Sequence, residues 1–206
     1  MARIDELRKQ ALANLRESEV LMTDGHFDYG NGYHGRVYLN PHRIFRTPSL
    51  IWRLAEDLLD LMPETVTAGA DVVAGPVMGG ALLAHTMAGL LDSRRSLERP
   101  PTSFAPLSLD AAGGLTLRPF YRTVVRGKRV LLADDVRNTG KTFERAKTLI
   151  EEAGAMVIAS AQIYDRLEAI VDLGVPNFAL VEYKAPENYP AAECPLCKQG
   201  VAVTKF

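Results

Sequence analysis

Two acidic side chains stand in tandem near the middle of the chain, between an apolar run and a small polar turn. Asp134 and Asp135 directly follow the apolar residues 129–133. Carboxylates at such a position can accept hydrogen bonds from sugar hydroxyls or hold a hydrated magnesium ion indirectly. The alternative is that they only cap the helix that follows. Because one acid suffices for a cap, we interpret the pair as the catalytic acids of a ligand site.

The turn after the acids is suited to a phosphate monoester. Its residues lie at a predicted helix N-terminus, where unpaired N–H groups and the helix dipole favour an anion: Asn138, Thr139, Gly140, Lys141 and Thr142. The run NTGKT also resembles the end of a nucleotide P-loop, but the glycine required five residues before Gly140 is Asp135. A ligand whose phosphate binds the amides and whose two adjacent hydroxyls bind the acids is a ribose 5-phosphate.

A second glycine-bearing turn precedes another helical pattern. It comprises Gly75, Pro76, Val77, Met78, Gly79 and Gly80. Glycines allow the backbone to approach a ligand closely, so the turn is a candidate anion site. Taken alone, the same glycines are nearly as well explained by tight packing of a strand against a helix.

Strands and helices must alternate to position these two turns. The strand-like apolar runs are 71–74, 129–133, 156–164 and 178–183. Helical patterns cover 81–91 and the segment from Phe143 to Ala153, and we expect a short helix between the last two strands. This order predicts an α/β fold with a parallel sheet flanked by helices, whose ligands lie beyond the carboxyl ends of the strands.

The ends of the chain are expected to add smaller parts to this sheet. Residues 1–47 should form an N-terminal helix and an irregular flap, or hood, and residues 184–206 a C-terminal tail. We treat residues 1–206 as a single domain, because the chain can enclose one good core.

Composition limits the classes of partner. The 206 residues are 47% hydrophobic and carry a formal net charge of −1, which gives no long-range field for nucleic acid or an anionic membrane. The first residues lack the apolar stretch of a secretory signal, so we expect a cytoplasmic protein that binds small molecules or copies of itself.

The only two cysteines form a CPLC segment near the C-terminus. Cys194 and Cys197 could supply half of a zinc site, completed across a dimer or by His26 or His34. With a single CxxC in the chain, the default interpretation is buried or free thiols, and we assign no metal-ligating residue.

The motifs together resemble those of type I phosphoribosyltransferases, and most closely the short orotate phosphoribosyltransferases that end in a CPLC segment. The resemblance rests on VLLADDVRNTGKT, VVAGPVMGG, GHFDYGNGYHGRVYLN, GGLTLRP and IYDR. It implies binding of 5-phosphoribosyl-1-diphosphate (PRPP) with Mg²⁺ as cofactor. The first turn would hold the ribose 5-phosphate, the glycine turn the pyrophosphate.

The same resemblance implies a base site and an assembly. Arg166 would pair with the orotate carboxylate, Tyr38 and Leu39 would form a wall against the pyrimidine ring, and Asn138 would stand where the family has a small hydroxyl residue. Arg166 could instead bridge Asp165 or cap a helix, and Tyr38 could belong to the core. The family also implies a homodimer.

Several basic residues that this family uses are missing. The expected mobile loop, residues 105–114, contains no lysine or arginine and one acid, Asp110; Gly30 and Gly79 replace further basic residues, and Arg137 replaces an apolar one. Each donor aimed at developing charge is typically worth ~3 kcal/mol. Lys141, Arg137 or Arg118, or a residue from a neighbouring subunit, would have to compensate.

Three functions therefore remain open. The first is transfer of the 5-phosphoribosyl group from PRPP to orotate, the second is transfer to another nucleobase, and the third is a non-catalytic regulator that binds PRPP or a nucleotide. The uncharged loop favours the third, and the altered flap and Asn138 favour the second.

Overall fold

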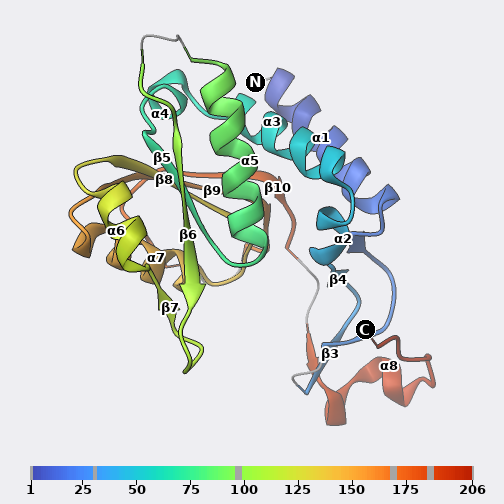
Figure 1. The fold of residues 1–206 in the computed structure, drawn as a ribbon. Helices are drawn as coiled ribbons and strands as arrows, with labels where there is room; N and C mark the ends of the chain where they lie inside the picture. Colours follow the sequence, from blue (N-terminus) through green and yellow to red (C-terminus); the bar gives the residue numbers. More distant parts are fainter. Residues whose placement is uncertain (1, 30–31, 96–98, 168–170, 185–187, 206) are drawn as a thin grey trace.

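A six-stranded sheet forms the centre of the molecule (Figure 1). The structure, a computed structural model, describes residues 2–29, 32–95, 99–167, 171–184 and 188–205. The strand order is β10-β9-β8-β5-β6-β7, and all neighbours are parallel except β6 and β7. The strands are β5 (Val72–Pro76), β6 (Ser103–Leu109), β7 (Leu115–Thr116), β8 (Arg129–Arg137), β9 (Met156–Asp165) and β10 (Asn177–Glu182).

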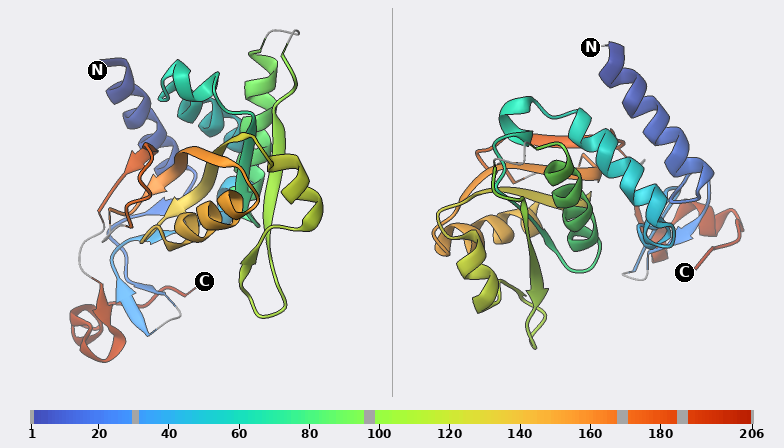
Figure 2. Two further views of the ribbon diagram at one scale, coloured as in Figure 1. Left: turned by 90° about the vertical axis from the view of Figure 1, so that its left-hand side faces the viewer. Right: turned by 45° about the horizontal axis from the view of Figure 1, so that its top comes forward.

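Helices cover both faces of this sheet, which confirms the predicted fold class (Figure 2). The helices on one face are α1 (Ala2–Glu17), α3 (Pro48–Asp60) and α5 (Gly79–Ser93), and those on the other are α6 (Pro119–Val125) and α7 (Lys141–Glu152). Successive side chains of β8 point to opposite faces of the sheet, and this explains the two layers of helices. Leu131 and Ala133 pack into the core on the face of α5, and Val130 and Leu132 pack into the core on the face of α7. A short α4 (Glu64–Thr67) leads into β5.

Both ends of the chain build a small lobe beside the sheet, which we call the hood and define as residues 21–39 and 189–204 (Figure 1). Its strands are β1 (Leu21–Met22), β2 (Phe27–Asp28), β3 (Tyr33–Gly35), β4 (Tyr38–Leu39) and β11 (Tyr189–Pro190). β1 pairs with β4, β3 lies between β11 and β2, and a parallel bridge joins Phe27 to Thr204. The C-terminal part adds the 3-10 helix η1 (Ala191–Glu193) and α8 (Pro195–Lys198), and α2 (His42–Phe45) leads from the hood to the sheet domain.

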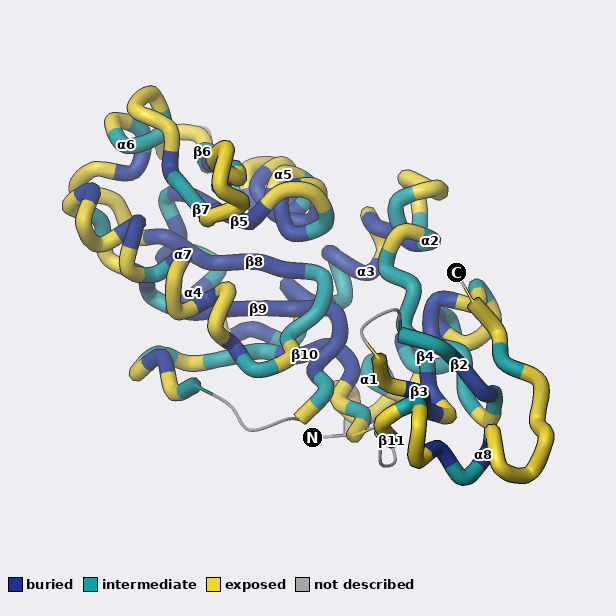
Figure 3. The backbone as a smooth tube through the Cα atoms, turned by 90° about the horizontal axis from the view of Figure 1, so that it is seen from below, coloured by how far each residue is buried: buried dark blue, intermediate teal, exposed yellow. Residues whose placement is uncertain are grey.

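Burial differs sharply between these parts. Figure 3 shows β8 and β9 buried along most of their length, whereas the outer loops of the hood are exposed. The hood strands contain two or three residues each. Such short strands bury little apolar area and are marginal on their own.

The structure corrects three sequence-based boundaries. β8 runs through the acidic pair to Arg137, so the phosphate turn begins at Asn138. Residues 105–109 of the expected mobile loop belong to β6, where Ala105 and Leu107 are fully buried. The short helix expected between β9 and β10 is absent from the described residues of that connection. The chain there makes a turn in which Gly174 N–H donates to Asp172 Oδ1 (2.8 Å).

No helix within the described residues combines the length and the apolar character needed to cross a bilayer.

Candidate active site

The acidic pair and the glycine turn meet at the carboxyl ends of two neighbouring strands. β5 and β8 are adjacent, and the chain continues from β5 to β6 on one side and from β8 to β9 on the other, so the strand order changes direction between them. Ligands of open α/β sheets bind at such a point. The sequence-based placement of the site is therefore consistent with the topology.

Glycine is required where these two turns touch. A Cβ at Gly79 would lie 2.1 Å from Asp135 Oδ2, and one at Gly80 would lie 2.7 Å from Asp134 Oδ1. A Cβ at Gly75 would lie 2.2 Å from the Gly80 carbonyl oxygen, so this glycine serves strand-to-helix packing. A lysine at position 79 would require the side chains of Asp135 and Phe45 to shift.

Asp134 is buried, Asp135 is half-buried, and both carry perturbed pKa values. Burial, reinforced by the neighbouring Asp135 carboxylate, raises the pKa of Asp134 well above its ordinary value. Burial also raises the pKa of Asp135, although hydrogen bonds and the charge of His42 partly offset it. Neither carboxylate forms an ion pair with a lysine or arginine of the part of the chain that the structure describes. A ligand that supplies hydroxyl donors or a cation would therefore stabilise their ionised forms.

Neither acid caps the helix that follows. Gly140 is the N-cap residue of α7, with a left-handed φ of 85° and no side-chain cap. The acids instead accept local backbone bonds, from Asp135 N–H to Asp134 Oδ1 (2.9 Å) and from Val136 N–H to Asp135 Oδ1 (2.8 Å). The helix-cap interpretation is therefore wrong, and the first amides of α7 remain suited to an anion.

Two cavities open beside the acidic pair. The first, about 650 Å³, lies under the hood, and we call it the hood cavity. The second, about 530 Å³, lies between the two turns, and we call it the turn cavity. Asp135 and Pro41 line both, so one carboxylate faces two adjoining compartments.

The hood cavity contains all four residues predicted to bind a base. Tyr38, Leu39, Asn138 and Arg166 line it, and Arg166 Nη1 donates to Asn138 Oδ1 at 3.3 Å. Arg166 thus contacts a residue of the other turn rather than capping a helix.

Sequence reasoning missed further members of this cavity: Tyr29, Tyr33, Tyr164 and Asn188. Tyr29 OH donates to the Val37 carbonyl (2.6 Å) and Tyr164 OH to the Tyr183 carbonyl (3.0 Å). Burial raises the pKa of both phenols. The spacing of Tyr164 two residues before Arg166 was the available signal, because alternate residues of a strand share a face.

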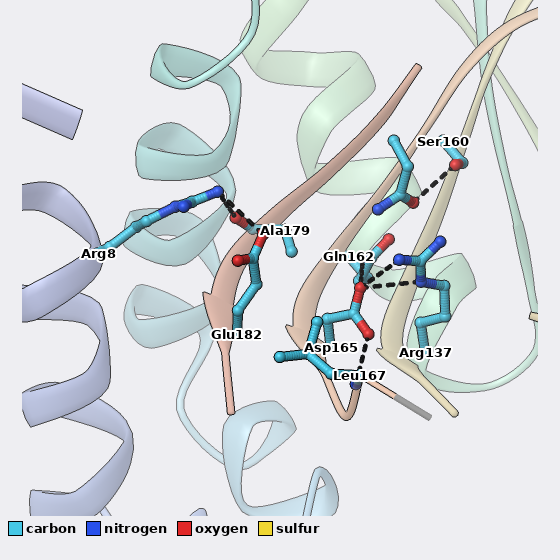
Figure 4. A network of polar contacts seen from close by, with 9 residues as sticks. Arg8, Arg137, Ser160, Gln162, Asp165, Leu167, Ala179 and Glu182 are labelled. Atoms are coloured by element: carbon cyan, nitrogen blue, oxygen red, sulfur yellow. Dashed lines mark hydrogen bonds and ion pairs between the residues drawn. The ribbon is translucent and has the colours of Figure 1, made fainter. Parts of the chain in front are cut away.

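A buried ion pair joins the ends of the two strands that carry Val136 and Tyr164 of the hood cavity, although neither member of the pair lines that cavity (Figure 4). Arg137 on β8 donates through Nε (2.9 Å) and Nη2 to Asp165 Oδ2 on β9, and Gln162 Nε2 donates to the same oxygen (3.0 Å). The other oxygen accepts the Leu167 N–H (2.9 Å), and Asp165 is only 1% exposed. Arg137 is thus committed to Asp165, and it does not supply charge to the turn cavity as the sequence had suggested.

The turn cavity collects most of the residues predicted to bind PRPP. Those that line it are Pro76, Val77, Met78, Gly79, Asp134, Asp135, Lys141 and Thr142. Gly75, Gly80, Thr139 and Gly140 shape the two turns without lining the cavity, and Asn138 faces the hood cavity instead.

Two basic side chains of the turn cavity were not anticipated. Arg145 lies one helical turn after Lys141, and His42 begins α2; both line the cavity. The i, i+4 spacing of Lys141 and Arg145 was the available signal. Arg118 is not among the residues that line the turn cavity, so it does not replace the missing basic residues of the loop.

The tip of the β6–β7 hairpin also lines the turn cavity, through Leu109, Gly113 and Leu115. Asp110 organises this tip, because its Oδ1 accepts the N–H groups of Ala112 (2.9 Å) and Gly114 (2.8 Å). The hairpin therefore presents apolar groups where the family would present basic ones. Gly30, at the other substituted position, lies outside the described residues.

Comparisons with known proteins agree with this geometry. Residues 44–173 match the family model of the phosphoribosyl transferase domain. An orotate phosphoribosyltransferase from Erythrobacter litoralis is 33% identical over 198 residues, covering 96% of this chain and 95% of the relative. One from Heliobacterium modesticaldum is 34% identical over 197 residues, covering 95% of each.

Solved structures show the same fold. The orotate phosphoribosyltransferase of Aeropyrum pernix superposes with a TM-score of 0.64 at 19% identity, covering 82% of this chain and 92% of that one. The Mycobacterium tuberculosis enzyme, whose structure was solved with PRPP, gives a TM-score of 0.54 at 16% identity, with 88% of this chain and 90% of that one covered.

Proposed function

This chain belongs to the phosphoribosyl transferase family, and within it to the orotate phosphoribosyltransferases, and on that premise we propose that it transfers the 5-phosphoribosyl group of PRPP to orotate. The products are orotidine 5′-phosphate and pyrophosphate, and the reaction serves pyrimidine synthesis. One observation carries the proposal: two cavities of complementary character adjoin at Asp135, one aromatic with an arginine and one bounded by a helix N-terminus.

The hood cavity is assigned to the base. A planar pyrimidine carboxylate matches the planar guanidinium of Arg166, which can donate two parallel hydrogen bonds. Tyr29, Tyr33 and Tyr38 line the same cavity and offer aromatic faces and hydroxyls to the ring. A base without a carboxylate would leave the arginine poorly matched, and this favours orotate over the other bases.

The turn cavity is assigned to PRPP. The amides at the start of α7 and the side chains of Lys141 and Thr142 suit the 5′-phosphate, and the backbone of 75–80 suits the pyrophosphate. Asp134 and Asp135 lie between these two anion sites and accept the ribose hydroxyls. The anomeric carbon would then lie near Asp135, where the turn cavity meets the hood cavity.

Magnesium fits the donors present. Asp134 and Asp135 are hard oxygen ligands, and among the described residues neither is paired with a lysine or arginine. When bound, Mg²⁺ would neutralise charge on the departing pyrophosphate. The residues of the chain orient the two substrates for displacement at the anomeric carbon, and the hood and the hairpin tip exclude water from an oxocarbenium-like transition state.

A cytoplasmic location and a homodimer complete the proposal. Both are supported by the family resemblance. Light scattering on the purified chain would test the assembly, because a dimer has twice the 22.6 kDa mass of the chain.

An absorbance assay tests the function directly. Purified protein is mixed with Mg²⁺ and PRPP, and the consumption of orotate, uracil, guanine, hypoxanthine and adenine is followed separately. We expect orotate alone to be consumed, in step with pyrophosphate release. Consumption of another base instead would contradict the assignment of the hood cavity.

The lack of basic residues in the hairpin tip favours a second candidate, a PRPP-binding protein without turnover. Saturable PRPP binding with no consumption of any base, measured by calorimetry beside the absorbance assay, would select it. Arg145 is the observation against this candidate, because it adds a cation to the turn cavity that the sequence motif did not reveal.

A further inference from the structure

Four side chains that bind metals well meet in the hood, and none of them lines either cavity. They are His26, His34, Cys194 and Cys197, and one ligand atom from each lies within 4.8 Å of all the others. We call them the His/Cys cluster. The two histidines come from the first 40 residues and the two cysteines from the last 13, so the fold alone brings them together.

The distances within the cluster match the edges of a metal tetrahedron. His26 Nε2 lies 3.1 Å from His34 Nδ1, 3.4 Å from Cys194 Sγ and 3.7 Å from Cys197 Sγ. Cys197 Sγ lies 3.3 Å from His34 Nδ1. Zinc–nitrogen bonds of ~2.0–2.1 Å and zinc–sulfur bonds of ~2.3 Å at tetrahedral angles give ligand separations of about 3.3–3.8 Å. A metal ion therefore fits at the centre with only small adjustments.

The histidine rings are oriented as metal ligands usually are. His26 Nδ1 lies 2.9 Å from the Val201 carbonyl oxygen, which can only accept, so the ring proton is on Nδ1 and the lone pair of Nε2 faces the cluster. His34 points Nδ1 into the cluster and Nε2 toward Asp28 Oδ1, 4.0 Å away. An oxygen acceptor behind a ligating imidazole fixes its orientation and raises its basicity.

The ligand set and its burial favour zinc in a closed, structural site. Two thiolates and two imidazoles select zinc over hard cations such as Mg²⁺, and four protein ligands leave no open position for a substrate. His26, His34 and Cys194 are 2%, 8% and 0% exposed and Cys197 is exposed, so three of the four ligands are shielded from water. The two thiolates would balance the charge of the ion.

The location of the cluster suggests what a metal would do. His26 precedes β2 and His34 lies in β3, while Cys194 is the N-cap residue of α8 and Cys197 lies within α8. Tyr29 and Tyr33, which line the hood cavity, lie between the two histidines in the sequence. A metal would join the tail to strands too short to be stable alone, and it would hold one wall of the hood cavity in place.

We propose that His26, His34, Cys194 and Cys197 of a single chain bind one structural Zn²⁺ ion that fastens the C-terminal tail to the hood. The site is complete within one chain, so it needs no partner subunit. It is independent of the function proposed above, because none of its ligands contacts the cavities assigned to the substrates.

The first experiment measures metal content. Untagged protein is purified under reducing conditions without chelator from cells grown with zinc, and its metals are quantified by mass spectrometry. We expect about one zinc ion per chain. Protein stripped of metal and titrated with Co²⁺ should show the ligand-field and sulfur-to-metal bands of tetrahedral thiolate coordination. Metal-free protein that binds neither added Zn²⁺ nor Co²⁺ would overturn the proposal.

Matched variants then locate the site. Cys194→Ser combined with Cys197→Ser, and His26→Gln alone, should each lower the zinc content at least about tenfold, because serine and glutamine are poor zinc ligands. His85→Gln is the control, since His85 lies on α5 and packs against Phe104 away from the cluster. Zinc retained in the cysteine variant, or lost equally in the His85 variant, would contradict the assignment.

Limited proteolysis provides a readout that does not depend on activity. Removal of zinc should increase the rate of cleavage between Lys184 and the C-terminus at least about tenfold and leave the sheet domain resistant, because only the hood is fastened by the cluster. Restoration of protection by added Zn²⁺, but not by Mg²⁺, is expected. Equal protection with and without metal would exclude the fastening role.

Discussion

The two cavities of the active site are built in opposite ways. Beside the hood cavity a buried ion pair joins β8 to β9, and Arg166 of the cavity is already hydrogen-bonded to Asn138. The turn cavity holds a buried and a half-buried carboxylate, both with raised pKa values, and its hairpin wall is apolar. The base end is therefore preorganised, whereas the PRPP end depends on its ligand to bring compensating charge.

This difference shows where the chain departs from its family. Where the family has an apolar residue, Arg137 pairs with Asp165 beside the base end and lines neither cavity. The substitutions that remove basic residues weaken the PRPP end, where Lys141 and Arg145 of α7 are the cations that line the cavity among the described residues. Five predictions test this contrast, from the largest expected effect to the smallest.

Removal of the ion pair beside the base end should cause the largest loss of stability. Arg137→Met leaves the buried Asp165 carboxylate without its partner, and we expect a loss of about 3–5 kcal/mol in the free energy of unfolding, measured with urea. The control is Arg129→Met at the opposite end of β8, whose exposed pair with Asp71 (3.3 Å) should contribute less than about 1 kcal/mol. Equal losses in the two variants would show that the buried pair has no special role.

Arg166→Ala should weaken the binding of orotate and leave the binding of PRPP unchanged. We expect the KM for orotate to rise roughly 30- to 100-fold, about 2–3 kcal/mol, because hydrogen bonds to a charged group are lost. The KM for PRPP should stay within about twofold of the unchanged protein, since Arg166 does not line the turn cavity. The KM of Arg166→Lys for orotate should lie between that of the unchanged protein and that of Arg166→Ala. A parallel rise in the KM values for orotate and PRPP would indicate a structural role instead.

The acidic pair should affect the binding of PRPP alone. Replacement of both Asp134 and Asp135 by asparagine should weaken PRPP binding more than about tenfold in calorimetry, which is about 1.4 kcal/mol. Asp172→Asn, at an exposed turn that lines neither cavity, is the matched control. Unchanged PRPP affinity in the double variant would remove the ribose assignment.

The raised pKa of Asp134 also predicts a pH dependence of stability. Burial favours the protonated form in the folded protein, so ionisation above the raised pKa destabilises the fold. The protein should gain stability as the pH falls through that raised pKa toward the unfolded value near ~3.9, at about 1.4 kcal/mol per unit of pKa shift.

Asp134→Asn is the way to measure this effect, because asparagine does not titrate. Without ligand it should be more stable than the unchanged protein at pH values above the raised pKa, and the difference should narrow as the pH approaches the unfolded value. A difference that stays constant with pH would mean that Asp134 does not titrate in this range.

The smallest effect is expected from adding charge to the hairpin tip. Ala111→Lys places a cation in the turn between β6 and β7, and we expect about a threefold increase in kcat. The gain is modest because an exposed lysine is poorly oriented, and Ala111→Gln controls for size. No change with lysine would place the hairpin too far from the leaving group to influence it.

Much of the site could be predicted because it is local in sequence. The acidic pair, the phosphate turn and the glycine turn each occupy a short segment between a strand and a helix, and the parallel sheet brings the two turns together. β6 was missed because Pro106 interrupts its pattern. The structure tolerates that proline where β6 pairs with β5 on one side only, since β7 joins no earlier than Ser108.

The remaining parts depend on contacts between distant residues. Arg137 and Asp165 are register partners on neighbouring strands, and that register cannot be read from either segment alone. The CPLC spacing suggested half of a metal site, but the partners of the cysteines lie more than 150 residues away along the chain. The sequence named His26 and His34 as alternatives, whereas the structure brings both to the cysteines.

The bridge between Phe27 and Thr204 has a consequence for biosynthesis. The ribosome releases residues 21–39 well before β11, α8 and Thr204, because the whole sheet domain lies between the two parts of the hood in the sequence. The sheet domain can therefore assemble on the nascent chain while the second part of the hood is still missing. A chain that stops before β11 would keep its core and lose the enclosure of the hood cavity.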